Sequence, residues 1–153
     1  MSPVRMVDVG QKKEVVRVAR ATGRITLRPE TIQRMRNNSI EKGDVISAAQ
    51  IAGILSAKKT HEIIPLCHPI PLTNAVVNLE IEGNDVVVIT EVSALAKTGV
   101  EMEALVATTV ALLTVWDMTK QYEKDVRGQY PDTVIEGIRV VRKLKQKRTG
   151  ETR

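Results

Sequence analysis

Asp117 and Lys120 form the first pair in the sequence whose types and spacing could do chemistry. They follow the apolar run Val115-Trp116, and on a helix the three-residue spacing places both side chains on one face, which Lys124 continues. A carboxylate beside a lysine can exchange protons with a substrate when partial burial tunes their pKa values. The same spacing also describes a solvated ion pair, so both interpretations stay open at this point.

Cys67 and His68 lie in segment 64–72, where three prolines exclude a regular helix or a central strand and predict a stiff, extended loop. Such a loop would hold His68 in place for proton transfer or phosphate contact, or the ring would bond the loop backbone. Cys67 is interpreted as a small buried residue rather than a nucleophile. We expect no metal site from His61, Cys67 and His68, since two of them are adjacent and no fourth ligand is evident.

Two acidic residues, Glu101 and Glu103, open the helix that carries Asp117. Thr98-Gly-Val-Glu101 matches a capping box with Thr98 as N-cap, which gives Glu101 a structural role, whereas Glu103 has none. Glu103 precedes Asp117 by 14 residues, or about 21 Å at ~1.5 Å per residue. The two carboxylates therefore serve an extended pocket, or a second subunit completes the site. Among the scattered cations, a subset that converged on one cleft would bind an anion.

The elements that must position these residues alternate between strand and helix patterns. We expect strands over 15–27 (with a bend at Gly23), 74–81, 85–92 and 134–141. We expect helices over 29–36, from 45 to about 59 with Asp44 as N-cap, and from about 98 to 122. The last helix is apolar almost all round, so it should be buried on more than one side, partly by subunit contact. This order predicts an α+β, ferredoxin-like (split βαβ) antiparallel sheet with helices on one face and one extra N-terminal helix.

Composition limits the classes of protein that remain. The 153 residues suit a single domain, 1–153, with loose termini at about 1–11 and 144–153. We expect no membrane span, because no apolar run reaches the necessary length, and no signal peptide. The single cysteine favours a cytoplasmic protein. Without Phe, the core must consist of Val, Ile, Leu, Ala and Met, and the net charge of +5 resides in residues 142–153. The sequence contains no G-x-x-x-x-G-K-[ST], G-x-G-x-x-G, paired C-x-x-C or H-E-x-x-H motif.

Five segments closely resemble the cyclic pyranopterin monophosphate synthase family, the C protein of molybdenum-cofactor biosynthesis. They are Met6-Val-Asp-Val9, Lys42-Gly-Asp-Val45, Ile64-Pro-Leu-Cys-His-Pro69, Lys97-Thr-Gly-Val-Glu-Met-Glu-Ala-Leu105 and Trp116-Asp-Met-Thr-Lys120. The resemblance runs from about residue 6 to 143. It implies a lyase that converts 3′,8-cyclo-7,8-dihydroguanosine 5′-triphosphate to cyclic pyranopterin monophosphate and releases pyrophosphate. It also implies a ferredoxin-like fold, and a hexamer built as a trimer of dimers with sites between subunits.

The resemblance also assigns roles to residues. Asp117 would be catalytic, with Lys120 as its partner in proton transfer. Substrate would be bound by Leu66, Cys67, His68, Glu101, Met102 and Glu103, and its triphosphate by Arg17, Lys42, Lys58 and Lys143. It implies no cofactor, and a magnesium requirement stays open. Two segments differ from the family: 127–132 looks like an insertion, and the end of the chain lacks the usual Gly-Gly-Lys-Ser-Gly tail.

Two other classes of function compete with the synthase. A basic nucleic-acid-binding αβ module would fit the basic tail, but the expected strands carry no aromatic residue on which bases could stack. A non-catalytic oligomeric scaffold would explain the apolar helix but not the set Glu103, His68, Asp117 and Lys120. We therefore expect a small-molecule enzyme that binds neither nucleic acid nor membrane.

Overall fold

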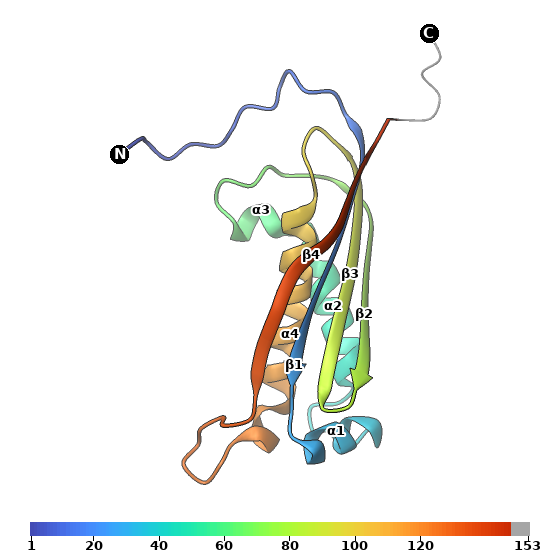
Figure 1. The fold of residues 1–153 in the computed structure, drawn as a ribbon, viewed down its shortest axis with the longest axis vertical. Helices are drawn as coiled ribbons and strands as arrows, with labels where there is room; N and C mark the ends of the chain where they lie inside the picture. Colours follow the sequence, from blue (N-terminus) through green and yellow to red (C-terminus); the bar gives the residue numbers. More distant parts are fainter. Residues whose placement is uncertain (148–153) are drawn as a thin grey trace.

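A computed structural model describes residues 1–147 of the chain, and within them four strands and four helices form an α+β domain (Figure 1). In chain order the elements are β1 (Val15–Thr26), α1 (Pro29–Arg36), α2 (Val45–Lys58), α3 (Thr60–Ile63), β2 (Leu72–Glu82), β3 (Asp85–Ala96), α4 (Glu101–Glu123) and β4 (Val134–Gln146). The first element is a strand, as expected, and α1 follows it at the position of the helix expected over 29–36. Within the described residues no helix precedes the sheet.

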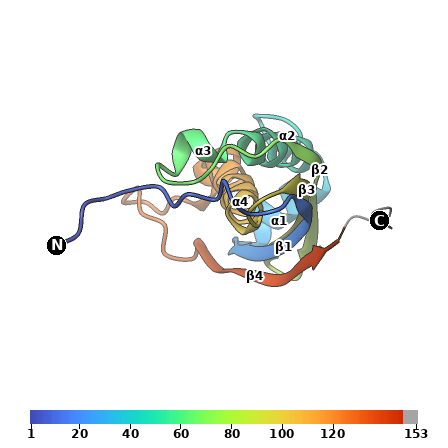
Figure 2. The ribbon, with the colours of Figure 1, turned by 90° about the horizontal axis from the view of Figure 1, so that it is seen from above.

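The sheet has the order β2-β3-β1-β4, and each pair of neighbours is antiparallel. In β3 every second residue is buried, as expected for a strand with one covered face. The helices α2 and α4 cover that face (Figure 2). The expected hairpin between β2 and β3 is confirmed: Glu82 pairs with Asp85, and Gly83 takes the positive φ of 60° that the tight turn requires.

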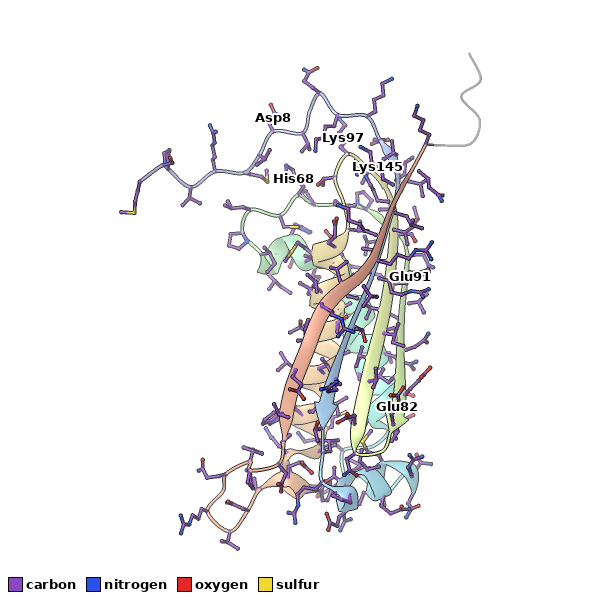
Figure 3. All side chains as sticks on the ribbon, viewed as in Figure 1. Asp8, His68, Glu82, Glu91, Lys97 and Lys145 are labelled. Atoms are coloured by element: carbon purple, nitrogen blue, oxygen red, sulfur yellow. The ribbon has the colours of Figure 1, made fainter. Side chains whose placement is uncertain are left out.

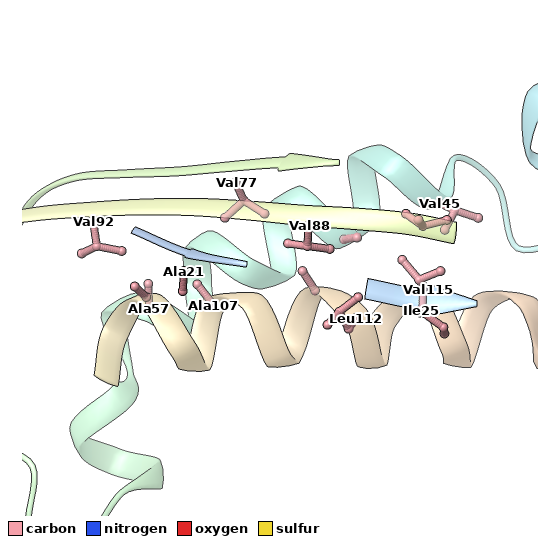
Figure 4. Close-up of a cluster of buried hydrophobic side chains, with 14 of the residues drawn as sticks. Ala21, Ile25, Val45, Ala57, Val77, Val88, Val92, Ala107, Leu112 and Val115 are labelled. Carbon is pink, nitrogen blue, oxygen red and sulfur yellow. The ribbon is translucent and has the colours of Figure 1, made fainter. Parts of the chain in front are cut away.

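The core is built from small and aliphatic side chains, as the absence of Phe predicts (Figure 4). Close approach of α2 to its neighbours depends on Gly53, where a Cβ would lie 3.1 Å from the carbonyl oxygen of Ala107 on α4 and 3.0 Å from Val77 on β2. Ala49, Ala57 and Ala107 are also fully or almost fully buried. A core of this kind gains its stability from close packing rather than from a few large side chains.

The central element is α4, and its burial on two sides is confirmed: it packs against the sheet and against α2. An 18-residue window of this 23-residue helix has a mean hydropathy of 1.2, so α4 is long and apolar enough to cross a membrane by length and composition only, although no such run was expected from the sequence. Most of the apolar stretch is buried inside the domain, as in the core helix of a globular fold.

Most element boundaries agree with the sequence patterns, but β2 and β3 are longer than the expected 74–81 and 85–92. Pro29 begins α1, and the Asp44 carboxylate caps α2 by accepting the N–H of Ser47 at 3.2 Å. The Thr98 capping box is wrong: Val100 is the N-cap of α4 and no side chain caps the helix. The Glu101 carboxylate instead accepts a bond from Lys143 on β4, which continues to Gln146 rather than ending at Val141.

At the other end of α4, the buried Glu123 joins three segments. Its carboxylate accepts hydrogen bonds from the N–H of Arg28 (3.1 Å to each oxygen), from the hydroxyl of Thr31 and from the hydroxyl of Thr133 at 2.7 Å. The side chain is 0% exposed. This carboxylate fixes the start of α1 and the approach to β4 against the end of α4.

We expect Glu123→Gln to lower the free energy of unfolding by about 1–3 kcal/mol, because an amide leaves at least one buried donor without its charged acceptor. Urea denaturation measures the change. The matched control is Glu80→Gln on the exposed side of β2, which should stay within about 0.5 kcal/mol of the parent. Equal stability of the two variants would contradict the role given to Glu123.

Candidate active site

The predicted site residues separate into two groups at opposite ends of α4. The Asp117 group consists of Lys42, Asp117 and Lys120, at the end where α2 begins. The Glu103 group lies at the end where α4 begins and α2 ends, shown at the top of Figure 1. Its members are Arg17, Lys58, Leu66, Cys67, His68, Glu101, Met102, Glu103 and Lys143. Because α4 is one continuous helix from 101 to 123, it holds Glu103 and Asp117 about 21 Å apart along its axis.

In the Asp117 group, one carboxylate lies between two ammonium groups. Lys42 Nζ is 2.8 Å from Asp117 Oδ2 and 3.0 Å from the main-chain oxygen of Asp117, and Lys120 Nζ is 2.9 Å from Oδ1. The hydrogen bond from Lys42, followed by that from Lys120, lowers the pKa of Asp117 to about 2. The same contact with Asp117 raises the pKa of Lys120.

The apolar residues before Asp117 led us to expect that this pair is partly buried. For the single chain that expectation is wrong. The side chains of Asp117 and Lys120 are 57% and 43% exposed, because they lie on the outer face of α4, whereas Met118 and Thr119 between them are buried. Contact with a substrate or with another subunit would be needed to remove this ion pair from water. In the chain alone, Asp117 is fully ionised at neutral pH and accepts bonds from two cations.

In the Glu103 group, a buried carboxylate oxygen lacks a partner. Glu103 is only 2% exposed, and within the described residues its Oε2 accepts no hydrogen bond. Its Oε1 lies 3.8 Å from the Cys67 sulfur. Burial raises the pKa of Glu103, although its backbone bond and the Cys67 thiol oppose that shift. A buried acceptor without a donor is costly, so this oxygen is suited to an N–H or O–H group of a ligand.

Cys67 is a thiol rather than a nucleophilic thiolate. Burial is the largest cause of its raised pKa, and the negative charge of Glu103 is the next. The thiol therefore acts as a weak hydrogen-bond donor beside Glu103. This agrees with the expectation that Cys67 is not a nucleophile, although the residue is half-buried rather than buried.

Glu101 and Lys143 join the start of α4 to β4 through a 2.7 Å ion pair. Burial acts to raise the pKa of Glu101, but the hydrogen bond and charge of Lys143 and the charge of Arg17 outweigh it and lower this pKa. Arg17 in turn donates to the main-chain oxygen of Lys97 at 3.1 Å. Gly99 makes room for this arrangement, because a Cβ there would lie 2.0 Å from Glu101 Oε2. Two cations thus lie next to Glu101, which precedes the buried Glu103 by two residues.

The remaining candidates border this end of the molecule. His68 is half-buried, and its Nε2 lies 2.6 Å from the main-chain oxygen of Val7, so in the chain alone the ring forms a hydrogen bond with the backbone. Leu66 and Met102 are exposed at 45% and 39%, and Lys58 is the last residue of α2. Over residues 1–147, no three His, Cys, Asp or Glu side chains come together in a way that could hold a metal ion.

Some polar residues of this end were not predicted from the sequence. Lys12, Lys13, Lys145 and Lys147 line a basic cleft with Arg17 and Val15. The pairing of β4 with β1 places Lys145 opposite Arg17, and Figure 3 shows Lys145 and Lys97 at the same end as His68. If the last strand had been predicted to continue beyond Val141, Lys145 would have been placed in the sheet as a candidate site residue. Residues 148–153 of the basic tail lie outside the described part of the chain.

The site residues combine three features: a buried carboxylate with an unpaired oxygen, cations at the same end of the molecule, and a separate carboxylate–lysine group. This combination is typical of an acid–base enzyme that binds an anionic, hydrogen-bonding substrate. Comparison with known proteins gives the particular family. The model of the MoaC family matches residues 6–146, and the chain belongs to this family.

Curated relatives cover nearly the whole chain, and each is named a probable cyclic pyranopterin monophosphate synthase. The protein of Pyrococcus furiosus is 58% identical over 95% of this chain and 94% of its own length. That of Saccharolobus solfataricus is 53% identical over 95% and 98%, and that of Methanosarcina acetivorans is 52% identical over 92% and 89%. No finding supports the nucleic-acid-binding alternative, and the four described strands contain no aromatic residue.

We expect Glu103→Gln to speed the alkylation of Cys67 by iodoacetamide at pH 8. The substitution removes the negative charge that helps to raise the thiol pKa, so the pKa falls and more thiolate is present. Since Cys67 is the only cysteine, mass spectrometry of the whole chain reports this site alone. Glu62→Gln, an exposed glutamate on α3, is the control and should leave the rate unchanged. An unchanged rate in Glu103→Gln would show that the two side chains do not interact in solution.

Proposed function

We propose that this chain catalyses the reaction for which its relatives are named. It converts 3′,8-cyclo-7,8-dihydroguanosine 5′-triphosphate to cyclic pyranopterin monophosphate and releases pyrophosphate, as a lyase of molybdenum-cofactor biosynthesis. The observation that carries this proposal is the match to the MoaC family over residues 6–146, together with 58% identity to a named synthase over nearly its full length. The reaction as proposed uses no cofactor.

The Glu103 group is proposed to hold the guanine-derived ring. The unpaired Oε2 of Glu103 is a buried acceptor for a ring N–H, and the neighbouring thiol of Cys67 lies against the other oxygen. Leu66 and Met102 are exposed apolar residues at the same end, and they are suited to cover the faces of a flat ring. His68 would exchange its bond with the Val7 backbone for one with the substrate.

The cations are proposed to hold the triphosphate. Arg17 and Lys143 lie next to Glu101, and Lys58 ends α2 at the same end of the molecule. Lys42 and Lys120 flank Asp117 at the other end. Positive charge is needed here because, when a substrate hydroxyl attacks the α-phosphorus, pyrophosphate leaves with the electrons of the broken P–O bond.

Asp117 and Lys120 are proposed to be the catalytic pair. Opening and reclosing the rings moves protons on and off nitrogen and oxygen, and a carboxylate hydrogen-bonded to an ammonium group can accept a proton at one atom and supply one from the other. Ion pairing keeps Asp117 ionised and therefore available as the acceptor. Burial of the pair against a substrate would bring its pKa values closer to neutrality.

Glu103 and Asp117 are proposed to act on one substrate from two subunits. One rigid helix separates them by about 21 Å, and Asp117 is exposed in the single chain. Packing the Asp117 end of one copy against the Glu103 end of another would join the two groups and remove both from water. We propose a homohexamer, a trimer of dimers, in which each site contains residues of two chains.

Two further assignments complete the proposal. The antiparallel order β2-β3-β1-β4, with α2 and α4 on one face, supports a ferredoxin-like fold with α1 as an additional short helix. A cytoplasmic location is supported by Cys67, which as the only cysteine forms no disulfide within the chain.

The direct test is incubation of the protein with the cyclised nucleotide and measurement of the pyrophosphate released. The parent chain should release pyrophosphate, whereas Asp117→Asn and Lys120→Ala should each lose turnover by about 100-fold or more, the usual contribution of a positioned acid or base. Asp125→Asn, in the loop after α4, is a matched carboxylate-to-amide control and should retain activity. Full turnover by Asp117→Asn would overturn the catalytic assignment.

Mixing two inactive variants tests the shared site. Asp117→Asn keeps Glu103, and Glu103→Gln keeps Asp117, so chains dissociated together and reassembled should form some sites with both native residues. If each site draws its two groups from different chains, random mixing restores about a quarter of the parent activity. Restoration should be absent when either variant is dissociated and reassembled alone. No restoration in the mixture would place both groups of a site in one chain.

A further inference from the structure

All three aromatic residues of the chain lie at the Asp117 end. Trp116 precedes Asp117, and its ring centroid is 5.2 Å from that of Tyr130, in the loop between α4 and β4. Tyr122 lies five residues after Asp117 on α4, and the guanidinium carbon of Arg34 is 4.6 Å from its ring centroid. In a protein with no Phe, this concentration of rings singles out one end of α4.

The Tyr122 hydroxyl has a specific partner. It accepts a hydrogen bond from the main-chain N–H of Glu41 at 2.9 Å, and the adjacent Gln121 donates to Glu41 Oε2 at 3.1 Å. Glu41 lies in the segment between α1 and α2. Two consecutive residues of α4 therefore bind Glu41 through both its backbone and its side chain.

Glu41 immediately precedes Lys42, whose ammonium group contacts Asp117 at two oxygens. An exposed lysine loses conformational entropy when it is held in one geometry, and such surface ion pairs usually gain little. Fixing the backbone next to Lys42 lowers that cost, because fewer torsions remain free between the anchored peptide and the ammonium group. The hydrogen bond at Glu41 thus favours the contact between Lys42 and Asp117.

We propose that Tyr122 is a positioning residue of the candidate catalytic group: through its bond to Glu41 it holds Lys42 against Asp117. It touches neither Asp117 nor Lys120 by a hydrogen bond within the described structure, so its effect passes through Lys42. Its importance for turnover rests on the proposed function, whereas its effect on the contact between Lys42 and Asp117 does not.

The test is an NMR titration of the Asp117 side-chain carboxyl in the full chain, which needs no substrate. Lys42 is the largest cause of the low pKa of Asp117, about 2 in the parent. Tyr122→Phe keeps the ring that contacts Arg34 but loses the hydroxyl, so the contact of Lys42 should loosen and the pKa of Asp117 should rise. Lys42→Ala should raise it further, and adding Tyr122→Phe to Lys42→Ala should change nothing more.

Thr109→Val is the control, because it removes a hydroxyl of α4 that donates only to the main-chain oxygen of Leu105, away from Glu41 and Lys42; it should leave the Asp117 titration unchanged. An unchanged pKa in Tyr122→Phe would overturn the proposal. A rise that persists in the Lys42→Ala background would also overturn it, since Tyr122 would then act on Asp117 by another route, such as a general loosening of the fold.

A kinetic measurement extends the test to turnover. Tyr122→Phe should lower kcat/KM for pyrophosphate release by roughly three- to tenfold, the range of one net hydrogen bond, and Thr109→Val should leave it unchanged. If the titration shifts as expected but no variant and no parent chain releases pyrophosphate, the proposed reaction fails while the positioning role stands. If the parent is active and the titration of Tyr122→Phe does not move, the positioning role fails alone.

Discussion

The length and rigidity of α4 are the constraints on which the rest of the molecule depends. The helix runs unbroken from Glu101 to Glu123 and packs against the sheet and α2. It carries a carboxylate of the candidate site near each end. A side chain spans a few ångströms, so neither Glu103 nor Asp117 can cross the axial distance between them. The fold therefore makes a two-chain site the simplest way for one small substrate to meet both groups.

The same helix gives its two carboxylates opposite electrostatic environments. Glu103 is buried, and burial raises its pKa, whereas two lysine ammonium groups lower the pKa of the exposed Asp117 to about 2. Separate environments of this kind are how enzymes give different tasks to chemically similar groups. Under the proposed function, the first carboxylate recognises a polar ring and the second takes part in proton movement.

Local signals in the sequence predicted much of the fold, and contacts between distant segments account for most of the errors. Pro29, the Asp44 cap and the Gly83 turn act within a few residues, so their elements were found correctly. The expected capping box failed because Glu101 bonds Lys143 on β4, a residue 42 positions away. For the site, spacing along one helix correctly predicted that Glu103 and Asp117 lie far apart. The exposure of Asp117 and the unpaired oxygen of Glu103 depend on how neighbouring segments pack, so the sequence did not predict them.

The central claim is that copies of this chain share each catalytic site. The most direct test measures the specific activity and the sedimentation of the same samples over a dilution series. The account predicts that activity per chain falls in proportion to the fraction of dissociated chains, and that it returns when the same sample is concentrated. Dissociated single chains that retain full specific activity would contradict it.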